Sequence, residues 1–217
     1  MTIEIVLASG NQGKLQEFQT LLAKTQFRVL PQSDFAVVGA EETGLSYVEN
    51  AIIKARHASH CTGLPAIADD SGLEVDYLNG APGIYSARFA GESASDQDNN
   101  SKLLKLMENI PENQRSARFQ CVLVYMRNEN DPAPTVCQGT WEGRVLTRPR
   151  GKHGFGYDPL FYALDQGCSS AQLPAQKKNL VSHRARAMLA LLNIIHAMTP
   201  EGMVLGQPAE GDTTQYD

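Results

Sequence analysis

The stretch "LASGNQGKLQEF" (Leu7–Phe18) joins the end of an apolar segment to the start of a helical pattern. The mostly apolar segment Ile3–Ala8 predicts a buried strand. Apolar residues then recur at helical spacing, at Leu15, Phe18, Leu21 and Leu22. This spacing predicts an amphipathic helix over residues 14–24. A strand that runs through a polar turn into a helix is the opening unit of an α/β fold.

Strands and helices continue to alternate along the chain. The sequence predicts further strands at Phe27–Leu30, Pro65–Ala68, Leu73–Tyr77, Arg118–Met126 and Thr135–Leu146. It predicts further helices from Ser46 to about His60, around Leu103, Leu104 and Met107, and over Val181–Met198. We expect Pro65–Ala68 and Leu73–Tyr77 to form a hairpin, and residues 79–95 to form a loop. Interleaved elements with two long adjacent strands predict an α/β fold with a mixed sheet.

Composition and charge favour a soluble, cytoplasmic protein. The chain has 217 residues, a formal net charge of -5, 42% hydrophobic residues and 20% charged residues. This acidity argues against a broad nucleic-acid surface, although a few local cations and a divalent ion can still bind a nucleotide. We find no membrane-spanning run, no signal peptide and no CxxC spacing, so we expect free thiols in a reducing compartment. The polar tail from Pro200 is predicted to be disordered.

The opening turn resembles a phosphate loop but lacks the features of a Walker motif. Gly10 and Gly13 are too close together, and Leu15 stands where the hydroxyl residue is required. A polar turn at a helix N-terminus still favours an anion, with donors from Ser9 and Asn11 and a charge from Lys14. The alternative is an ordinary strand-to-helix turn with a surface lysine.

Two adjacent carboxylates, Asp69 and Asp70, follow the short strand predicted at Pro65–Ala68. Adjacent residues of a strand point to opposite faces, so we expect one carboxylate in a cleft and the other in an anchoring role. Glu41 or Glu42 would supply a second ligand for magnesium, which prefers hard oxygen atoms. The alternative is a solvated turn, because "DDSG" is good turn chemistry.

The stretch "GFGYD" is a candidate for recognition of a flat ligand. Its glycines give the backbone room, and an exposed Phe155 or Tyr157 would stack on a base, while Asp158 accepts hydrogen bonds. Further on, Ser182 is a plausible N-cap that precedes His183 and Arg184, whose charges would oppose the helix dipole. The alternatives are a tyrosine-containing turn and an exposed helix start.

Seven motifs, in this order, closely resemble the inosine/xanthosine triphosphate pyrophosphatase family in its bacterial branch. They are "SGNQGK", "EETG", "ENAIIKA", "ADDSGL", "GAPGIYSAR", "GFGYDP" and "SHR", and the resemblance runs from about Ile3 to Met198. It implies a single two-lobed domain over residues 1–199, with an elongated mixed sheet and a nucleotide cleft between the lobes. It also implies a homodimer that uses Mg²⁺ to hydrolyse deaminated purine nucleoside triphosphates to the monophosphate and pyrophosphate.

The same resemblance implies a role for each motif residue. Asp70 would be the general base, Glu42 and Asp70 the metal ligands, and Ser71 a substrate contact. The triphosphate would be held by Ser9, Gly10, Asn11, Gln12, Gly13, Lys14 and Lys54. The base would be bound by Phe155, Gly156, Tyr157, Asp158, Lys178, His183 and Arg184. The chain departs from the family at Lys177, where a glutamate is usual, and we expect this to alter a neighbouring salt bridge without changing the chemistry.

Selectivity has a physical basis in the purine 6-position. Inosine and xanthosine carry a hydrogen-bond acceptor there, whereas adenine carries a donor, so donors from Arg184, His183 or Lys178 would reject adenine. Guanine shares the 6-oxygen, and the sequence does not show which residue rejects it. The rival enzyme class is a pyrophosphatase of the septum-formation-inhibitor type, which acts on modified pyrimidine nucleotides. Non-enzymatic rivals are a nucleotide-sensing module and an RNA-binding protein.

Overall fold

A single seven-stranded mixed sheet runs through the computed structural model, which describes residues 2–23 and 25–197. The strand order is β2-β1-β3-β4-β5-β6-β7. The strands are β1 (Ile3–Leu7), β2 (Phe27–Pro31), β3 (Ala66–Val75), β4 (Ser116–Met126), β5 (Thr135–Val145), β6 (Phe161–Ala163) and β7 (Cys168–Ser169). β2, β1 and β3 pair in parallel, and the remaining neighbours pair antiparallel, so the predicted mixed α/β sheet is confirmed.

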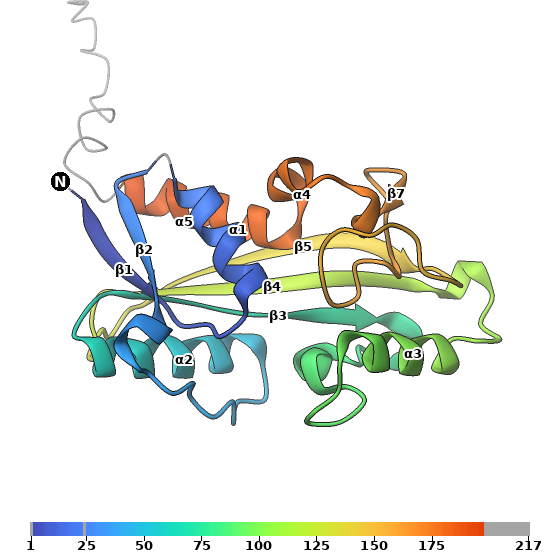
Figure 1. Cartoon of the computed structure of the whole chain (residues 1–217), viewed down its shortest axis with the longest axis horizontal. Coiled ribbons are helices and arrows are strands. Elements are labelled where there is room, and N and C mark those ends of the chain that lie inside the picture. The colour runs from blue at the N-terminus through green and yellow to red at the C-terminus, as the bar shows by residue number, and fades with distance from the viewer. Residues whose placement is uncertain (1, 24, 198–217) are drawn as a thin grey trace, which may run out of the picture.

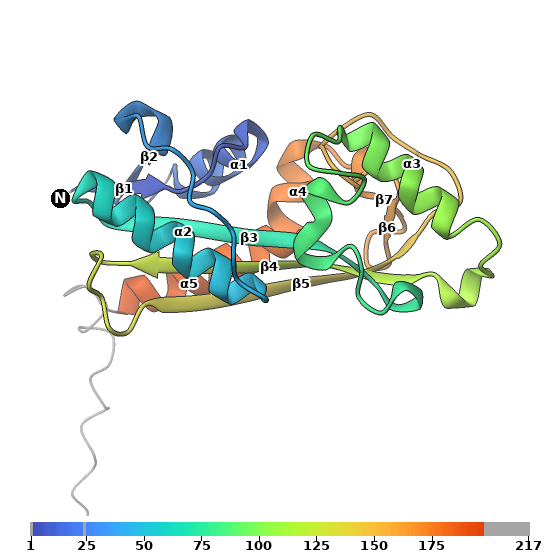
Figure 2. The same ribbon diagram turned by 90° about the horizontal axis from the view of Figure 1, so that it is seen from below.

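Helices cover both faces of this sheet. They are α1 (Gln12–Leu22), α2 (Tyr47–Thr62), α3 (Asp96–Leu106), α4 (Ala175–Val181) and α5 (His183–Ala197). α1, α4 and α5 lie on one face, and α2 and α3 lie on the other (Figures 1 and 2). The long strands β3, β4 and β5 run along the molecule, with β1, β2 and α2 at one end and α3, β6 and β7 at the other (Figures 1 and 2).

Side chains alternate between the two faces of the sheet, so the end that carries β1 contributes residues to two hydrophobic clusters, one on each face. Ile5 and Leu7 point into a cluster with residues of α1 and α5, while Val6 and Ala8 point into a cluster with the alanines of α2. A third cluster, built around Trp141, Phe161 and Leu103, fills the other end. The cleft described below lies between these two ends.

β3 differs from the predicted hairpin, because it is one continuous strand. All ten of its residues pair with β4, from Ala66 opposite Met126 to Val75 opposite Ala117. The predicted turn at "DDSG" therefore lies in the middle of a strand, and both aspartates are buried. The predicted hairpin is therefore wrong, and so is the alternative of a solvated turn, because distant cations, described below, neutralise these carboxylates.

Two helix starts also refine the predictions. The helix predicted from Val181 begins at His183, since Ser182 is extended, and its hydroxyl caps the helix by accepting a hydrogen bond from Ala185 N (3.2 Å). α4, which precedes it, was not predicted. The helix predicted from Ser46 begins at Tyr47, because Ser46 is the N-cap of α2: its side chain accepts a hydrogen bond from Glu49 N, and the Glu49 carboxylate accepts one from Leu45 N.

Other predictions concern the ends and the thiols. Residues 79–95 contain a short 3-10 helix, η3 (Gly83–Arg88), where a loop was predicted. All four cysteines are free, as expected. In the part of the chain that the structure describes, no helix has the length and apolar character that a membrane span requires. Met198 and the tail from Pro200 lie outside the described residues.

Candidate active site

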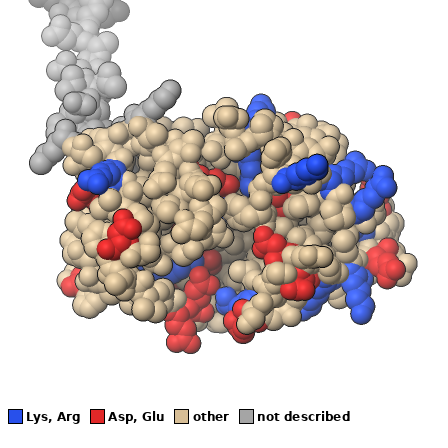
Figure 3. All heavy atoms as spheres, viewed as in Figure 1, with Lys and Arg blue, Asp and Glu red and all other residues tan. Residues whose placement is uncertain are grey.

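A cleft opens along one edge of β3, because β1 is shorter than its neighbour. β1 pairs with β3 only up to Leu7 opposite Ile67, whereas β3 continues for eight residues to Val75. The cavity beside this edge has a volume of about 340 Å³, in the range of small-molecule sites. Figure 3 shows acidic and basic side chains gathered around a hollow near the middle of one face. The lining includes, among the predicted residues, Ser9, Gly10, Asn11, Lys14, Glu42, Lys54, Ser71, Phe155, Gly156, Tyr157, Asp158, Lys178, His183 and Arg184.

The turn between β1 and α1 is built as a helix N-terminus that faces the cleft. Asn11 is the N-cap of α1, and its Oδ1 accepts a hydrogen bond from Lys14 N (3.0 Å). Ser9 Oγ accepts from Asn11 N (3.2 Å), which fixes the approach of the chain. Free N–H groups, the helix dipole and the Lys14 ammonium together can bind an anion. Of the predicted phosphate residues, Gln12 and Gly13 lie outside the cavity lining.

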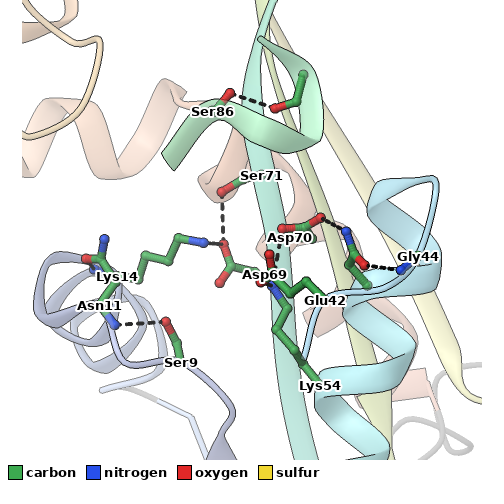
Figure 4. A network of polar contacts seen from close by, with 12 residues as sticks. Ser9, Asn11, Lys14, Glu42, Gly44, Lys54, Asp69, Asp70, Ser71 and Ser86 are labelled. Carbon is green, nitrogen blue, oxygen red and sulfur yellow. Dashed lines mark hydrogen bonds and ion pairs between the residues drawn. The ribbon is translucent and has the colours of Figure 1, made fainter. Parts of the chain in front are cut away.

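Asp69 faces α1 and α5 and is ionised. Lys14 Nζ lies 2.8 Å from its Oδ2, and Arg184 Nε and the Ser71 hydroxyl also donate to that oxygen, at 3.4 and 3.1 Å (Figure 4). Burial opposes ionisation, but the charges of Lys14 and Arg184 outweigh it and hold the pKa of Asp69 far below its usual value. Asp69 is thus the anchoring carboxylate that the alternation along the strand predicted.

Asp70 points to the opposite face, toward α2 (Figure 4), and, unlike Glu42 and Lys54, it is not among the residues that line the cavity. Its Oδ2 accepts from Asn50 Nδ2 and its Oδ1 from Lys54 Nζ, both at 3.2 Å. Asn50 is itself oriented, because its Oδ1 accepts from Gly44 N at 2.8 Å. Burial is the main cause that raises the pKa of Asp70 above its usual value. A carboxylate with a raised pKa and a fixed orientation is suited to accept a proton.

Glu42 is the member of the acidic pair that enters the cleft, whereas Glu41 is exposed. Its carboxylate pairs with Lys54 Nζ (2.8 Å) and with Arg88 Nη1 (3.3 Å). Burial works against the charge of Glu42, but Lys54 and Arg88 hold its pKa below the usual value.

The ammonium of Lys54 bridges Glu42 and Asp70, which marks a place where these two carboxylates accept a cation. Among the described residues, no cluster of three or more His, Cys, Asp or Glu side chains is arranged to hold a metal. A magnesium ion at this place would therefore have two carboxylate ligands. Its remaining ligands would be waters and substrate phosphates, which is the usual pattern for this ion.

The far end of the cavity combines an aromatic ring with a buried ammonium. Lys178 Nζ lies 4.8 Å from the centre of the Phe155 ring and pairs with Asp158 (2.6 Å) and Glu17 (3.3 Å). Asp158 also accepts from Phe155 N (2.9 Å), so one carboxylate shapes the loop and places the lysine. Two of the three Lys178 donors are used, which leaves one for a ligand.

Tyr157 does not have the exposure that was expected for a stacking residue. It is buried in the core cluster of the second end, and its hydroxyl donates to Ser86 O (2.9 Å). Phe155, which is half-buried, is the aromatic ring of the loop that remains available for stacking. Lys177 is exposed, so the departure from the family pattern at this position lies outside the cavity lining.

Arg184 is buried between two acidic side chains from distant parts of the chain. It donates to Asp69, to Glu17 and to Ser71 Oγ (3.2 Å). These contacts use four of its five N–H donors. α5 reaches the sheet closely enough for this because β5 has a glycine there: a Cβ on Gly139 would lie 2.1 Å from His183 O.

Sequence patterns assigned no role to three residues that hold side chains of the site in place. Glu17 links Lys178 with Arg184, Asn50 orients Asp70, and Arg88 holds Glu42. The available signal for Glu17 was its position one turn after Lys14, on the same side of the predicted helix. The sequence gives no comparable local signal for Arg88, because its partner is 46 residues away.

His183 is a buried neutral side chain, which corrects the prediction of a cation at this helix start. Its ring stacks on Phe119 at 4.7 Å, and its Nδ1 has no partner in the described structure. Burial, reinforced by the charges of Arg184 and Lys178, lowers its pKa well below 6.5.

Because His183 is buried and neutral, we expect the protein to lose stability in mild acid. The folded state resists protonation and the unfolded state does not, so the stabilisation is complete above pH 6.5 and declines as the pH falls. We expect the free energy of unfolding to fall by roughly 1.4 kcal/mol per pH unit below that point. Urea unfolding from pH 7 to pH 5 should show this slope in the wild type and lose it in His183→Gln. His153→Gln, at an exposed position, is the control, and an unchanged slope in His183→Gln would contradict the assignment.

Comparison with known proteins shows the family and the fold to which the chain is similar. A model described as the Ham1 family matches residues 5–194. The dITP/XTP pyrophosphatase of Vibrio parahaemolyticus serotype O3:K6 is 59% identical over 198 residues, which cover 91% of this chain and 99% of that protein. The one from Photobacterium profundum is 61% identical over 87% of this chain and 95% of its own. A solved HAM1 protein from Coxiella burnetii superposes with a TM-score of 0.83 at 50% identity, covering 89% and 98% of the two chains.

Proposed function

The chain belongs to the Ham1 family, and we propose that it is a nucleoside-triphosphate pyrophosphatase that acts on deaminated purine nucleotides. Its substrates are dITP, ITP, XTP and dXTP, and its products are the nucleoside monophosphate and pyrophosphate. One observation carries the proposal: a single cleft joins an anion-binding helix start, the Glu42–Lys54 pair that contacts the oriented carboxylate of Asp70, and a cation-lined aromatic pocket. Relatives with 52–61% identity bear the name dITP/XTP pyrophosphatase, which supports this substrate class.

The hydrolysis assigns a separate task to each end of the cleft. Ser9, Asn11 and Lys14 hold the triphosphate, and Asp70 accepts the proton of a water that attacks the α-phosphorus. The bond between the α-phosphorus and the bridging oxygen breaks, and pyrophosphate leaves with that oxygen. Lys54 supports the charge on the phosphates. No covalent enzyme intermediate is needed.

Glu42 and Asp70 would hold Mg²⁺. The ion would neutralise charge on the triphosphate oxygens, which is the chemistry that magnesium supplies to phosphoryl transfer. The contact between Lys54 and both carboxylates supports this assignment. The family resemblance also supports a cytoplasmic location and a homodimer. Light scattering of the purified protein would test the homodimer.

The base end would select for a purine 6-oxygen. Lys178 and Arg184 each keep an unused N–H donor next to Phe155, on which the base would stack. A 6-oxygen would accept from these donors, whereas the 6-amine of adenine would face them and leave buried donors unsatisfied.

Pyrophosphate release from four nucleotides tests this function. We expect fast release from dITP and XTP, and rates lower by about 100-fold or more for dATP and dGTP, in the presence of magnesium. A chelator should abolish release from all of them. Equal rates with all four nucleotides would remove the selectivity, and release from modified pyrimidine nucleotides alone would support the rival class. Binding without release would indicate a sensing module.

A further inference from the structure

The N-terminal turn of α3 is hydrogen-bonded to the loop that carries Phe155. Asp96 Oδ2 accepts a hydrogen bond from Gly156 N at 2.6 Å, and Asn100 Nδ2 donates to Gly156 O at 2.8 Å. The two side chains lie one helical turn apart, and Asn100 Nδ2 also donates to Asp96 O at 2.7 Å. Both peptide planes that flank Gly156 are therefore fixed by one helix.

Gly156 is the point of the loop where such support matters most. Its φ of +59° lies in the left-handed region, and a Cβ there would meet no atom within 4 Å, so neighbouring side chains do not restrict it. Glycine also has the greatest conformational freedom of any residue. Without the two hydrogen bonds from α3, the position of Phe155 next to it would depend on its hydrogen bond to Asp158 and on contacts of its own ring.

The ring of Phe155 reaches across the cleft to α1. A Cβ on Gly13 would lie 2.9 Å from two carbons of this ring, so the ring rests directly against the backbone of the phosphate-binding helix start. The position of Phe155 therefore links the base end of the cavity to the phosphate end, and small movements of the loop would change the space between them.

We propose that Asp96 and Asn100 are positioning residues that set how tightly the purine base is held against Phe155. This inference rests on the proposed function. The hydrogen bond to Asp96 is charge-assisted and short, which makes it the stronger of the two. The side chains act through Gly156 and need not touch the reacting atoms.

The helix offers a matched control for the test. Asp98 lies in the same turn as Asp96, but its carboxylate completes the capping box with Ser95. Asp98→Ala therefore weakens the start of α3 without removing a contact to Gly156. Asp96→Asn is the conservative variant, because an amide oxygen can still accept from Gly156 N.

Hydrogen exchange and steady-state kinetics decide the proposal together. In Asp96→Ala and Asn100→Ala we expect faster exchange of the Gly156 amide, and a KM for dITP raised roughly fivefold to tenfold with kcat changed less than about twofold. Asp98→Ala should leave both quantities unchanged, and Asp96→Asn should restore most of the wild-type values.

Two results would overturn the positioning role. One is a Gly156 exchange rate that is the same in all variants, and the other is faster exchange with an unchanged KM. Exchange is measured without nucleotide, so it judges the contact even if the wild type releases no pyrophosphate. In that case the proposed function fails, and unchanged dITP affinity by calorimetry would overturn the positioning role separately.

Discussion

Asp70→Asn is expected to lower kcat for dITP by about a thousandfold while the protein still binds the nucleotide. The amide has nearly the shape of the carboxylate and can keep a hydrogen bond from Lys54 or Asn50, but it cannot accept the proton of the attacking water. Because the pKa of Asp70 is raised above the usual aspartate value, its carboxylate is a stronger base than that of an ordinary aspartate. Stopped assays of pyrophosphate release, with nucleotide binding measured by calorimetry, check both parts of this expectation.

The control for this prediction is Asp76→Asn. Asp76 also pairs with a basic residue, Arg118 at 2.8 Å, but Arg118 lies outside the cavity lining, whereas Lys54, the partner of Asp70, is part of it. The Asp76→Asn variant should keep the wild-type kcat. Asp70 must be ionised to accept a proton. We therefore expect kcat/KM of the wild type to decrease as the pH is lowered, with an inflection above the usual pKa of aspartate. Normal turnover in Asp70→Asn would remove Asp70 from the role of base.

Local patterns in the sequence were sufficient for most of the fold. The strand that begins at Ile3, the helix that Asn11 caps and the two long strands β4 and β5 all follow from hydrophobic periodicity and turn chemistry. These signals depend on neighbours within a few residues, which is why they can be read directly from the chain.

The course of β3 was not predictable in the same way. Two adjacent aspartates followed by Ser-Gly have the local chemistry of a turn. They remain in a buried strand because Lys14, Lys54 and Arg184 neutralise them, and Arg184 is 115 residues away from Asp69 in the sequence. A stabilising contact over that separation leaves no trace in local propensity.

The candidate site shows the same division between local and distant information. The motifs identified the cleft residues, but the environment of each residue decided what it can do. Tyr157 and Phe155 are both aromatic residues of one loop and both line the cavity, yet Tyr157 is buried with its hydroxyl bonded to Ser86 O, whereas Phe155 is half-buried. α4 escaped prediction because it has only seven residues and no side-chain cap, although it delivers the buried Lys178.

Arg184→Met is expected to lower the free energy of unfolding by about 3 kcal/mol, as for one partner removed from a buried ion pair. The substitution leaves Asp69 and Glu17 buried with weaker compensation. Lys14 remains 2.8 Å from Asp69, and Lys178 remains 3.3 Å from Glu17. The loss of unfolding free energy should therefore not exceed the usual range for such a substitution. Urea unfolding at pH 7 measures the change, and Arg186→Met, an arginine of the same helix paired with Asp165 at the surface, is the control.

A second variant separates the structural role of Arg184 from its role in reading the base. Asp69→Asn combined with Arg184→Met removes both charges, so it should recover much of the lost stability. If Arg184 also reads the purine 6-oxygen, both variants should lose far more kcat/KM with dITP than with dATP, even where stability is recovered. An equal loss with both nucleotides would mean that Arg184 is structural. Selectivity would then rest on Lys178, whose remaining donor lies beside Phe155.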